Sequence, residues 1–87
     1  MDTFTTIQRL AAERLDLSTE SLAHARTLAE AGIDSLATLD LITAIEARFA
    51  IGIAPEDLDG VHSLRDLAAA VDRLVTRKSH VYEEALA

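Results

Sequence analysis

The chain has 87 residues, the length of a single small domain built around one core. Hydrophobic residues make up 49% of it, which argues against disorder, and the absence of cysteine excludes disulfides and thiolate chemistry. The net charge of −7 disfavours binding to nucleic acid or anionic lipid, since both are polyanions.

No targeting or membrane-spanning segment is evident in the sequence. No apolar run approaches the ~20 residues that a transmembrane helix needs, so no membrane insertion is expected. The N-terminus, Met1-Asp2-Thr3-Phe4, lacks the basic and apolar regions of a secretory signal peptide. This absence favours a cytoplasmic location.

The first half of the chain predicts one long helix and a long connection. The helix should begin at Asp2 or Thr3, either of which can cap it. Its apolar face is formed by Phe4, Ile7, Leu10, Ala11 and Leu15. The connection runs from about residue 16 to residue 33 and could contain a helical turn around residues 20–25. Loops of this length are often functional.

The clearest helical pattern extends from Ser35 to Phe49, with Asp34 as the expected N-cap. Its predicted core stripe consists of Leu39, Ile42, Ile45 and Phe49, with Leu41 adding to it. Pro55 should then open a brief helical turn, because proline suits the first helical position.

The last main helix should begin at the segment Ser63-Leu64-Arg65-Asp66. This segment resembles a capping box in which aspartate replaces the usual Glu or Gln. The predicted buried face of this helix consists of Leu64, Leu67, Ala68, Val71, Leu74 and Val75. Residues 1–76 are therefore expected to form the domain, and residues 77–87 a helical extension or a frayed tail.

These elements predict an all-α fold, a small four-helix bundle with three main helices and one short helix. No segment alternates between apolar and polar residues as a strand does. We therefore expect helix-on-helix packing around one core.

Ser35 is the residue most suited to carry chemistry, because it lies at the start of the clearest helix. A helix N-terminus presents free N–H groups and partial positive charge, both of which favour a phosphate. A phosphodiester on Ser35 would be stabilised there. The alternative is an ordinary serine in the first turn, since serine is common at helix starts.

The five residues Gly32-Ile33-Asp34-Ser35-Leu36 resemble the G-x-D-S-L motif of acyl carrier proteins. The resemblance extends over residues 28–49, from the end of the family's long loop through its second helix. Ile53-Ala54-Pro55-Glu56 resembles the I-x-P-E/D entry to its short third helix, and residues 64–74 resemble its last helix. In all, the resemblance covers about residues 4–75.

This resemblance implies a carrier rather than an enzyme. Ser35 would receive a 4′-phosphopantetheine arm from coenzyme A, attached by a separate Mg²⁺-dependent phosphopantetheinyl transferase. The thiol of the arm would hold an acyl chain as a thioester, and the helices could shelter that chain. Partners would be acyltransferase, ketosynthase or acyl-ligase enzymes. A monomer is the simplest oligomeric state to expect.

The resemblance also implies roles for residues around Ser35. Asp34 would help to present Ser35 to the transferase. Leu36 would either contact partner enzymes or be a half-buried helix residue, and both interpretations stay open. Further partner contacts are expected at Ile33, Asp40 and Glu46.

The sequence departs from the family pattern at several positions. In place of the usual E-D-L-G before the motif it has Ala29-Glu30-Ala31-Gly32, so an apolar anchor has shrunk to Ala31. Ala37, Ala47 and Arg48 occupy positions that are often acidic in fatty-acid carriers. Because charges at the rim of an interface tune partner choice, we hypothesise a specialised carrier for a lipid, fatty-acid or polyketide-type pathway.

Three other functions remain open. A peptidyl carrier usually has G-G-H/D-S-L, whereas Ile33 replaces the second glycine here. A serine hydrolase would need a base and an oxyanion hole, but the three histidines lie in predicted links or the tail. A helical interaction module would need no modification of Ser35. The histidines, His24, His62 and His80, lack metal-ligand spacing, so no metal site is predicted.

Overall fold

The computed structural model describes the backbone of residues 2–86 and the side chains of residues 2–78. Within these limits the chain is helical and contains no strand. The elements are α1 (Thr3–Leu15), α2 (Thr19–His24), α3 (Ser35–Phe49), the 3-10 helix η1 (Pro55–Leu58) and α4 (Leu64–Leu86). The predicted all-α bundle is therefore confirmed, and the turn expected around residues 20–25 is α2.

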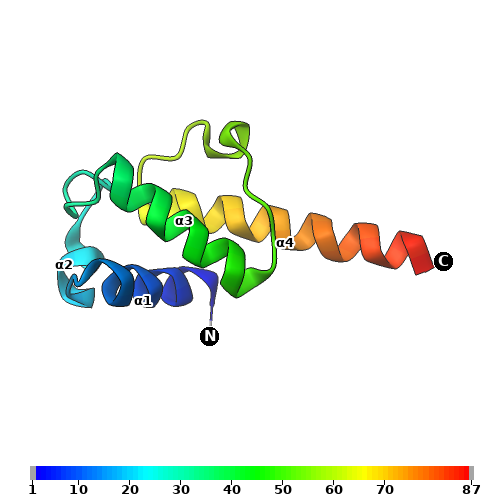
Figure 1. Ribbon diagram of the computed structural model, residues 1–87, viewed down its shortest axis with the longest axis horizontal. Coiled ribbons are helices and arrows are strands. Elements are labelled where there is room, and N and C mark those ends of the chain that lie inside the picture. Colours follow the sequence, from blue (N-terminus) through cyan, green and yellow to red (C-terminus); the bar gives the residue numbers. More distant parts are fainter. Residues whose placement is uncertain (1, 87) are drawn as a thin grey trace.

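The three long helices form the body of the bundle. Helix α1 packs against both α3 and α4, and α2 packs against α1. In Figure 1 the link that contains η1 lies across α3 from α1, and the end of α4 extends beyond the other helices. No helix of the described residues is both long enough and apolar enough to cross a membrane.

The core lies where the apolar faces of α1, α3 and α4 meet. Its largest fully buried side chains are Ile7, Leu41, Ile45, Leu67 and Val71. Among the described side chains, no polar or charged one is buried, so the core is purely aliphatic. The apolar spacing of the sequence predicted this arrangement, although Leu74 and Val75 are only partly covered.

The predicted core stripe of α3 is wrong at Leu39. The side chain of Leu39 is 62% exposed, whereas that of Leu41 is fully buried. Residues that are two apart in the sequence of an α-helix, such as Leu39 and Leu41, point about 200° apart around its axis. The two leucines therefore cannot face the same core. Helix α3 turns Leu41 and Ile45 toward the centre of the bundle, and this leaves Leu39 on the outside.

Short polar side chains set the helix starts. Asp2 caps α1, where its Oδ1 accepts the backbone N–H of Thr5 at 2.7 Å. At the start of α4, Ser63 Oγ accepts the N–H of Asp66 at 3.1 Å, as a capping box requires. The Asp66 carboxylate, however, accepts the N–H of His62 at 2.9 Å, one residue before the cap. This hydrogen bond from His62 holds the pKa of Asp66 below its ordinary value.

Candidate functional site

Ser35 is the first residue of α3, and its side chain is exposed. Asp34 is the N-cap, as predicted: its Oδ1 accepts the N–H of Ala37 at 2.8 Å. The carbonyl of Asp34 also accepts the Thr38 hydroxyl at 2.8 Å. Asp34 therefore fixes the first turn of α3 and with it the direction in which Ser35 leaves the helix.

The loop before α3 is held to the core by backbone hydrogen bonds. The N–H of Ile33 donates to the carbonyl of Leu28 at 2.9 Å, and the N–H of Leu28 donates to the carbonyl of His62 at 2.9 Å. Gly32 adopts φ +83, a conformation that side chains rarely tolerate. These features place Ser35 at a fixed point between the long loop and the start of α4.

The Ser35 hydroxyl is free of competing protein contacts. Among the described residues, no group hydrogen-bonds Ser35 Oγ, whereas the nearby Thr38 hydroxyl is engaged with the Asp34 carbonyl. An exposed hydroxyl without an internal partner can be approached by another enzyme.

A groove of ≈810 Å³ opens beside Ser35. It lies between α3, the loop before it and the link that leads to α4. Its apolar walls and polar rim are formed by Thr27, Leu28, Ala29, Ile33, Asp34, Ser35, Thr38, Leu39, Ile42, Leu58, Val61 and His62. A hydroxyl at the mouth of an apolar groove is suited to hold a modification whose far end is apolar.

The four predicted partner-contact residues differ in how far they are exposed to solvent. Leu36 is 78% exposed, so its interpretation as a half-buried residue is wrong. Ile33 is only 3% exposed and belongs to the core, although it also lines the groove, and its partner contact stays a prediction. A residue that follows a positive-φ glycine and leads into a helix is held inward here by its bond to Leu28.

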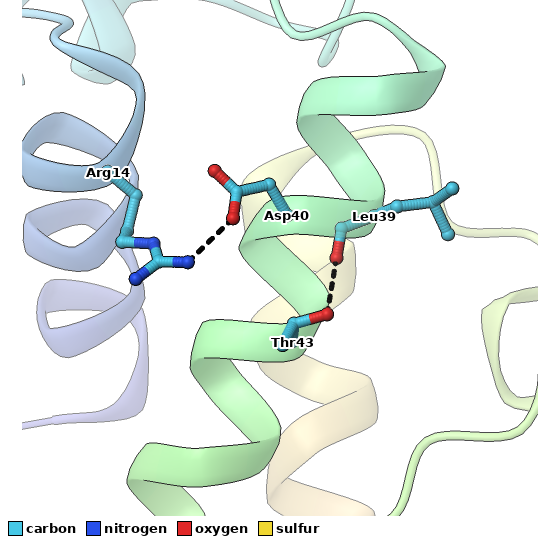
Figure 2. A network of polar contacts seen from close by, with 4 residues as sticks. All are labelled: Arg14, Leu39, Asp40 and Thr43. Atoms are coloured by element: carbon cyan, nitrogen blue, oxygen red, sulfur yellow. Dashed lines mark hydrogen bonds and ion pairs between the residues drawn. The ribbon is translucent and has the colours of Figure 1, made fainter.

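Asp40 and Glu46 are half-buried and bonded within the chain. Asp40 Oδ1 lies 2.7 Å from a guanidinium nitrogen of Arg14 on α1, a pair that Figure 2 shows bridging the two helices. A carboxylate oxygen of Glu46 accepts the N–H of Ile53 at 2.8 Å and so ties the link after α3 to that helix. Both carboxylates therefore already have a bonding partner within the chain.

Sequence reasoning missed most of the residues that line the groove, and Thr38 and His62 are two examples. Thr38 could have been found, because residues three apart on a helix lie on one side. His62 could not, since it reaches the groove only through the packing of the link before α4.

The chain matches the family model described as "Phosphopantetheine attachment site" over residues 5–71. This match spans well over half of the chain and includes the whole of α3. The chain therefore belongs to this family of carrier proteins, and the resemblance drawn from the sequence is confirmed.

Two relatives illustrate the range of the family. The chain is 27% identical over 73 residues to an acyl carrier protein of Helicobacter hepaticus, covering 83% of this chain and 96% of that protein. It is 29% identical over 83 residues to the non-reducing polyketide synthase ausA of Penicillium brasilianum. That match covers 95% of this chain and only 3% of the synthase.

The attached group of this family is 4′-phosphopantetheine, and the residues at the start of α3 fit it. Ser35 offers an exposed hydroxyl for a phosphodiester, and the first turn offers free N–H groups and partial positive charge. The apolar groove beside it fits an apolar cargo. The chain is thus a phosphopantetheine carrier.

Proposed function

We propose that Ser35 is the residue that holds the arm, and that the chain acts as a non-catalytic acyl carrier. One observation supports this above all: an exposed serine, directly after an aspartate N-cap, lies at the mouth of an apolar groove. Ser35 Oγ would be the oxygen of the phosphodiester. The arm supplies the thiol that this cysteine-free chain lacks, and that thiol holds acyl groups as thioesters.

Each neighbour of Ser35 has a distinct part in this proposal. Asp34 holds the first turn through its bond to the N–H of Ala37, and so presents the hydroxyl outward. Leu36, beside it, offers an exposed apolar contact to an enzyme that approaches Ser35. The walls of the groove, among them Leu39 and Ile42, would exclude water from the apolar part of the cargo.

We further propose a specialised pathway with synthase-type partner enzymes, for lipids, fatty acids or polyketides. The similarity to part of a polyketide synthase supports this, as do the neutral Ala37 and Ala47 and the basic Arg48 on α3. Equal rates of acyl exchange with housekeeping fatty-acid enzymes and with a polyketide-type synthase would contradict the specialised pathway.

Intact mass spectrometry tests the attachment site directly. The protein is incubated with coenzyme A, Mg²⁺ and a broad-specificity phosphopantetheinyl transferase, with the Ser35→Ala variant in parallel. We expect the wild-type chain to gain one phosphopantetheine unit and the variant to gain none.

Thr38→Ala is the matched control, because it removes another hydroxyl of the same groove. It should still gain the unit. If Ser35→Ala still gained a phosphopantetheine unit, the attachment site would be another residue. No gain in a folded wild-type chain would favour a helical interaction module.

A further inference from the structure

A second cavity, of ≈320 Å³, lies where α2 ends and α4 begins. Three segments that are distant in the sequence form it: the start of α1, the end of α2 with the two residues after it, and the start of α4. Its lining includes Phe4, His24, Arg26, Ser63 and Arg65, and it is called the α2–α4 pocket below. It shares no lining residue with the groove beside Ser35.

The α2–α4 pocket collects positive charge in an acidic chain. Among the described residues, His24, Arg26 and Arg65 line it and no carboxylate does. The whole chain has 15 acidic residues against 8 lysines and arginines, so the lining of this pocket departs from the composition of the protein. All three basic residues are exposed, and their side chains are therefore accessible to a molecule that enters the pocket.

Both guanidinium groups of the pocket have donors to offer. In the part of the chain whose side chains are described, neither Arg26 nor Arg65 forms an ion pair. The guanidinium carbon of Arg65 lies 4.4 Å from the centroid of the Phe4 ring. This contact with the ring attracts the cation and restricts its motion, while the N–H groups at its edge stay able to donate. A planar guanidinium binds the oxygens of a carboxylate or a phosphate through two parallel hydrogen bonds.

Carboxylates of the adjoining segments are engaged elsewhere. Those of Asp2, Glu30 and Asp66 each accept a backbone N–H, and none of the three residues lines the pocket. The hydrogen bond from Thr5 lowers the pKa of Asp2, and the nearby charge of Arg65 adds to this lowering. Asp2 therefore offsets part of the charge of Arg65 from outside the pocket.

We propose that the α2–α4 pocket binds a phosphate group, with the guanidinium groups of Arg26 and Arg65 as its main donors. A phosphate monoester carries a charge of about −1.5 to −2 at pH 7, which two guanidinium groups match better than one carboxylate does. His24 adds ring nitrogens at the same pocket. The phosphate would be either a free ion or part of a small ester. This inference does not depend on the modification of Ser35.

A bound phosphate would join the segment after α2 to the start of α4. One backbone bond already links these segments, since the N–H of Leu28 donates to the carbonyl of His62 at 2.9 Å. An anion held by Arg26 and Arg65 would add a second link and so stabilise the folded state. With a Kd of about 5 mM, phosphate at about 50 mM would raise the folding equilibrium constant about elevenfold.

An NMR titration of the full chain with sodium phosphate tests the site. Ionic strength is held constant with NaCl, because added salt alone screens every exposed charge. We expect the backbone amide signals of residues 24–26 and 63–65 to shift and to saturate, with a Kd of about 1–10 mM. Shifts that spread over the whole surface, or that grow without saturating, would overturn the inference.

Variants of the full chain separate a site from general attraction to charge. Arg26→Gln and Arg65→Gln each remove one guanidinium and should weaken phosphate binding about tenfold or more. Arg73→Gln is the matched control, because Arg73 is an exposed arginine of α4 that does not line the pocket. It should bind phosphate as the wild type does. Equal weakening in all three variants would overturn the inference.

Thermal melts give a second readout that does not depend on NMR. Phosphate stabilises many proteins without binding to a site, so its effect on Tm is compared with that of NaCl in each variant. The excess stabilisation by phosphate should be lost in Arg26→Gln and Arg65→Gln and kept in Arg73→Gln. Circular dichroism shows whether each variant is folded.

Two further ligands identify the source of the phosphate. AMP presents the same group on an organic molecule, whereas tetraglutamate presents carboxylates. Tighter binding of AMP than of inorganic phosphate, again dependent on Arg26 and Arg65, would indicate a phosphate ester, and similar binding a free phosphate ion. Tighter binding of tetraglutamate than of both would overturn the assignment to phosphate and indicate an acidic protein partner.

Discussion

Replacement of Asp34 tests whether the site depends on the geometry of the helix start. Asp34 Oδ1 accepts the N–H of Ala37 at 2.8 Å, and Asp34→Ala removes this bond. The loss of such an N-cap costs about 1 kcal/mol of stability. For a domain of this size, that corresponds to a fall in Tm of roughly 4–8 °C. Thermal melts followed by circular dichroism measure the fall.

Asp34→Asn is the matched variant, because it keeps an acceptor oxygen at the cap and removes the charge. If Asp34 presents Ser35 through the cap, the Asn variant should regain most of the Tm and most of the modification rate. The Ala variant should lose both. An Asn variant that is as stable as the wild type but is modified as slowly as the Ala variant would refute this reasoning. In that case the transferase would recognise the carboxylate charge itself.

Three further predictions concern the stability of the core, the start of α4 and the bounds of the carrier domain. Leu41→Ala should cost about 2–5 kcal/mol in chemical unfolding, because Leu41 is fully buried, whereas exposed Leu39→Ala should cost less than about 0.5 kcal/mol. The wild type should be more stable than Asp66→Ala above pH 3.8. Because the folded pKa of Asp66 is lowered, this advantage should disappear as the pH falls through that pKa. In acid titrations, a stability advantage that does not depend on pH would contradict this prediction. A chain ending at residue 76 should still gain the arm by mass spectrometry, and failure of the folded fragment to do so would refute a carrier domain of residues 1–76.

The start of α3 could be predicted from the sequence because its causes are local. An aspartate N-cap bonds to an N–H three residues later, and both partners lie within one turn. The same holds for Asp2 at α1 and for Ser63 at α4. Such short-range bonds do not depend on the rest of the fold, so these three helix starts followed from the residue types.

The orientation of α3 could not be predicted in the same way. Its sequence is apolar on almost every side, so the spacing of Leu39, Leu41 and Ile42 fits more than one buried face. The packing of α1 against α3 selects one of these faces, and Leu41 becomes part of the buried core. Likewise, Ile33 lies within the Gly32–Leu36 motif, and its burial depends on the fold, where its N–H bonds to the carbonyl of Leu28.

The groove and the internal charge pairs depend on contacts between distant segments. Val61 and His62 come from the link before α4, far along the chain from Ser35. The pairing of Arg14 with Asp40 joins α1 to α3, and neither residue shows in the sequence that it has a partner. The net charge of the chain therefore does not predict the charge of the surface that surrounds the site.

A carrier has to leave each enzyme after visiting it, and the two exposed leucines of α3, Leu36 and Leu39, are suited to weak contacts. If a partner buried both Leu36 and Leu39, the gain would be about 3–6 kcal/mol before any cost. Association itself costs an estimated 4–15 kcal/mol, so this patch alone cannot hold a long-lived complex. Lasting discrimination between enzymes must then come from the arm and its cargo inside the partner. The protein surface would decide mainly which enzymes approach Ser35 at all.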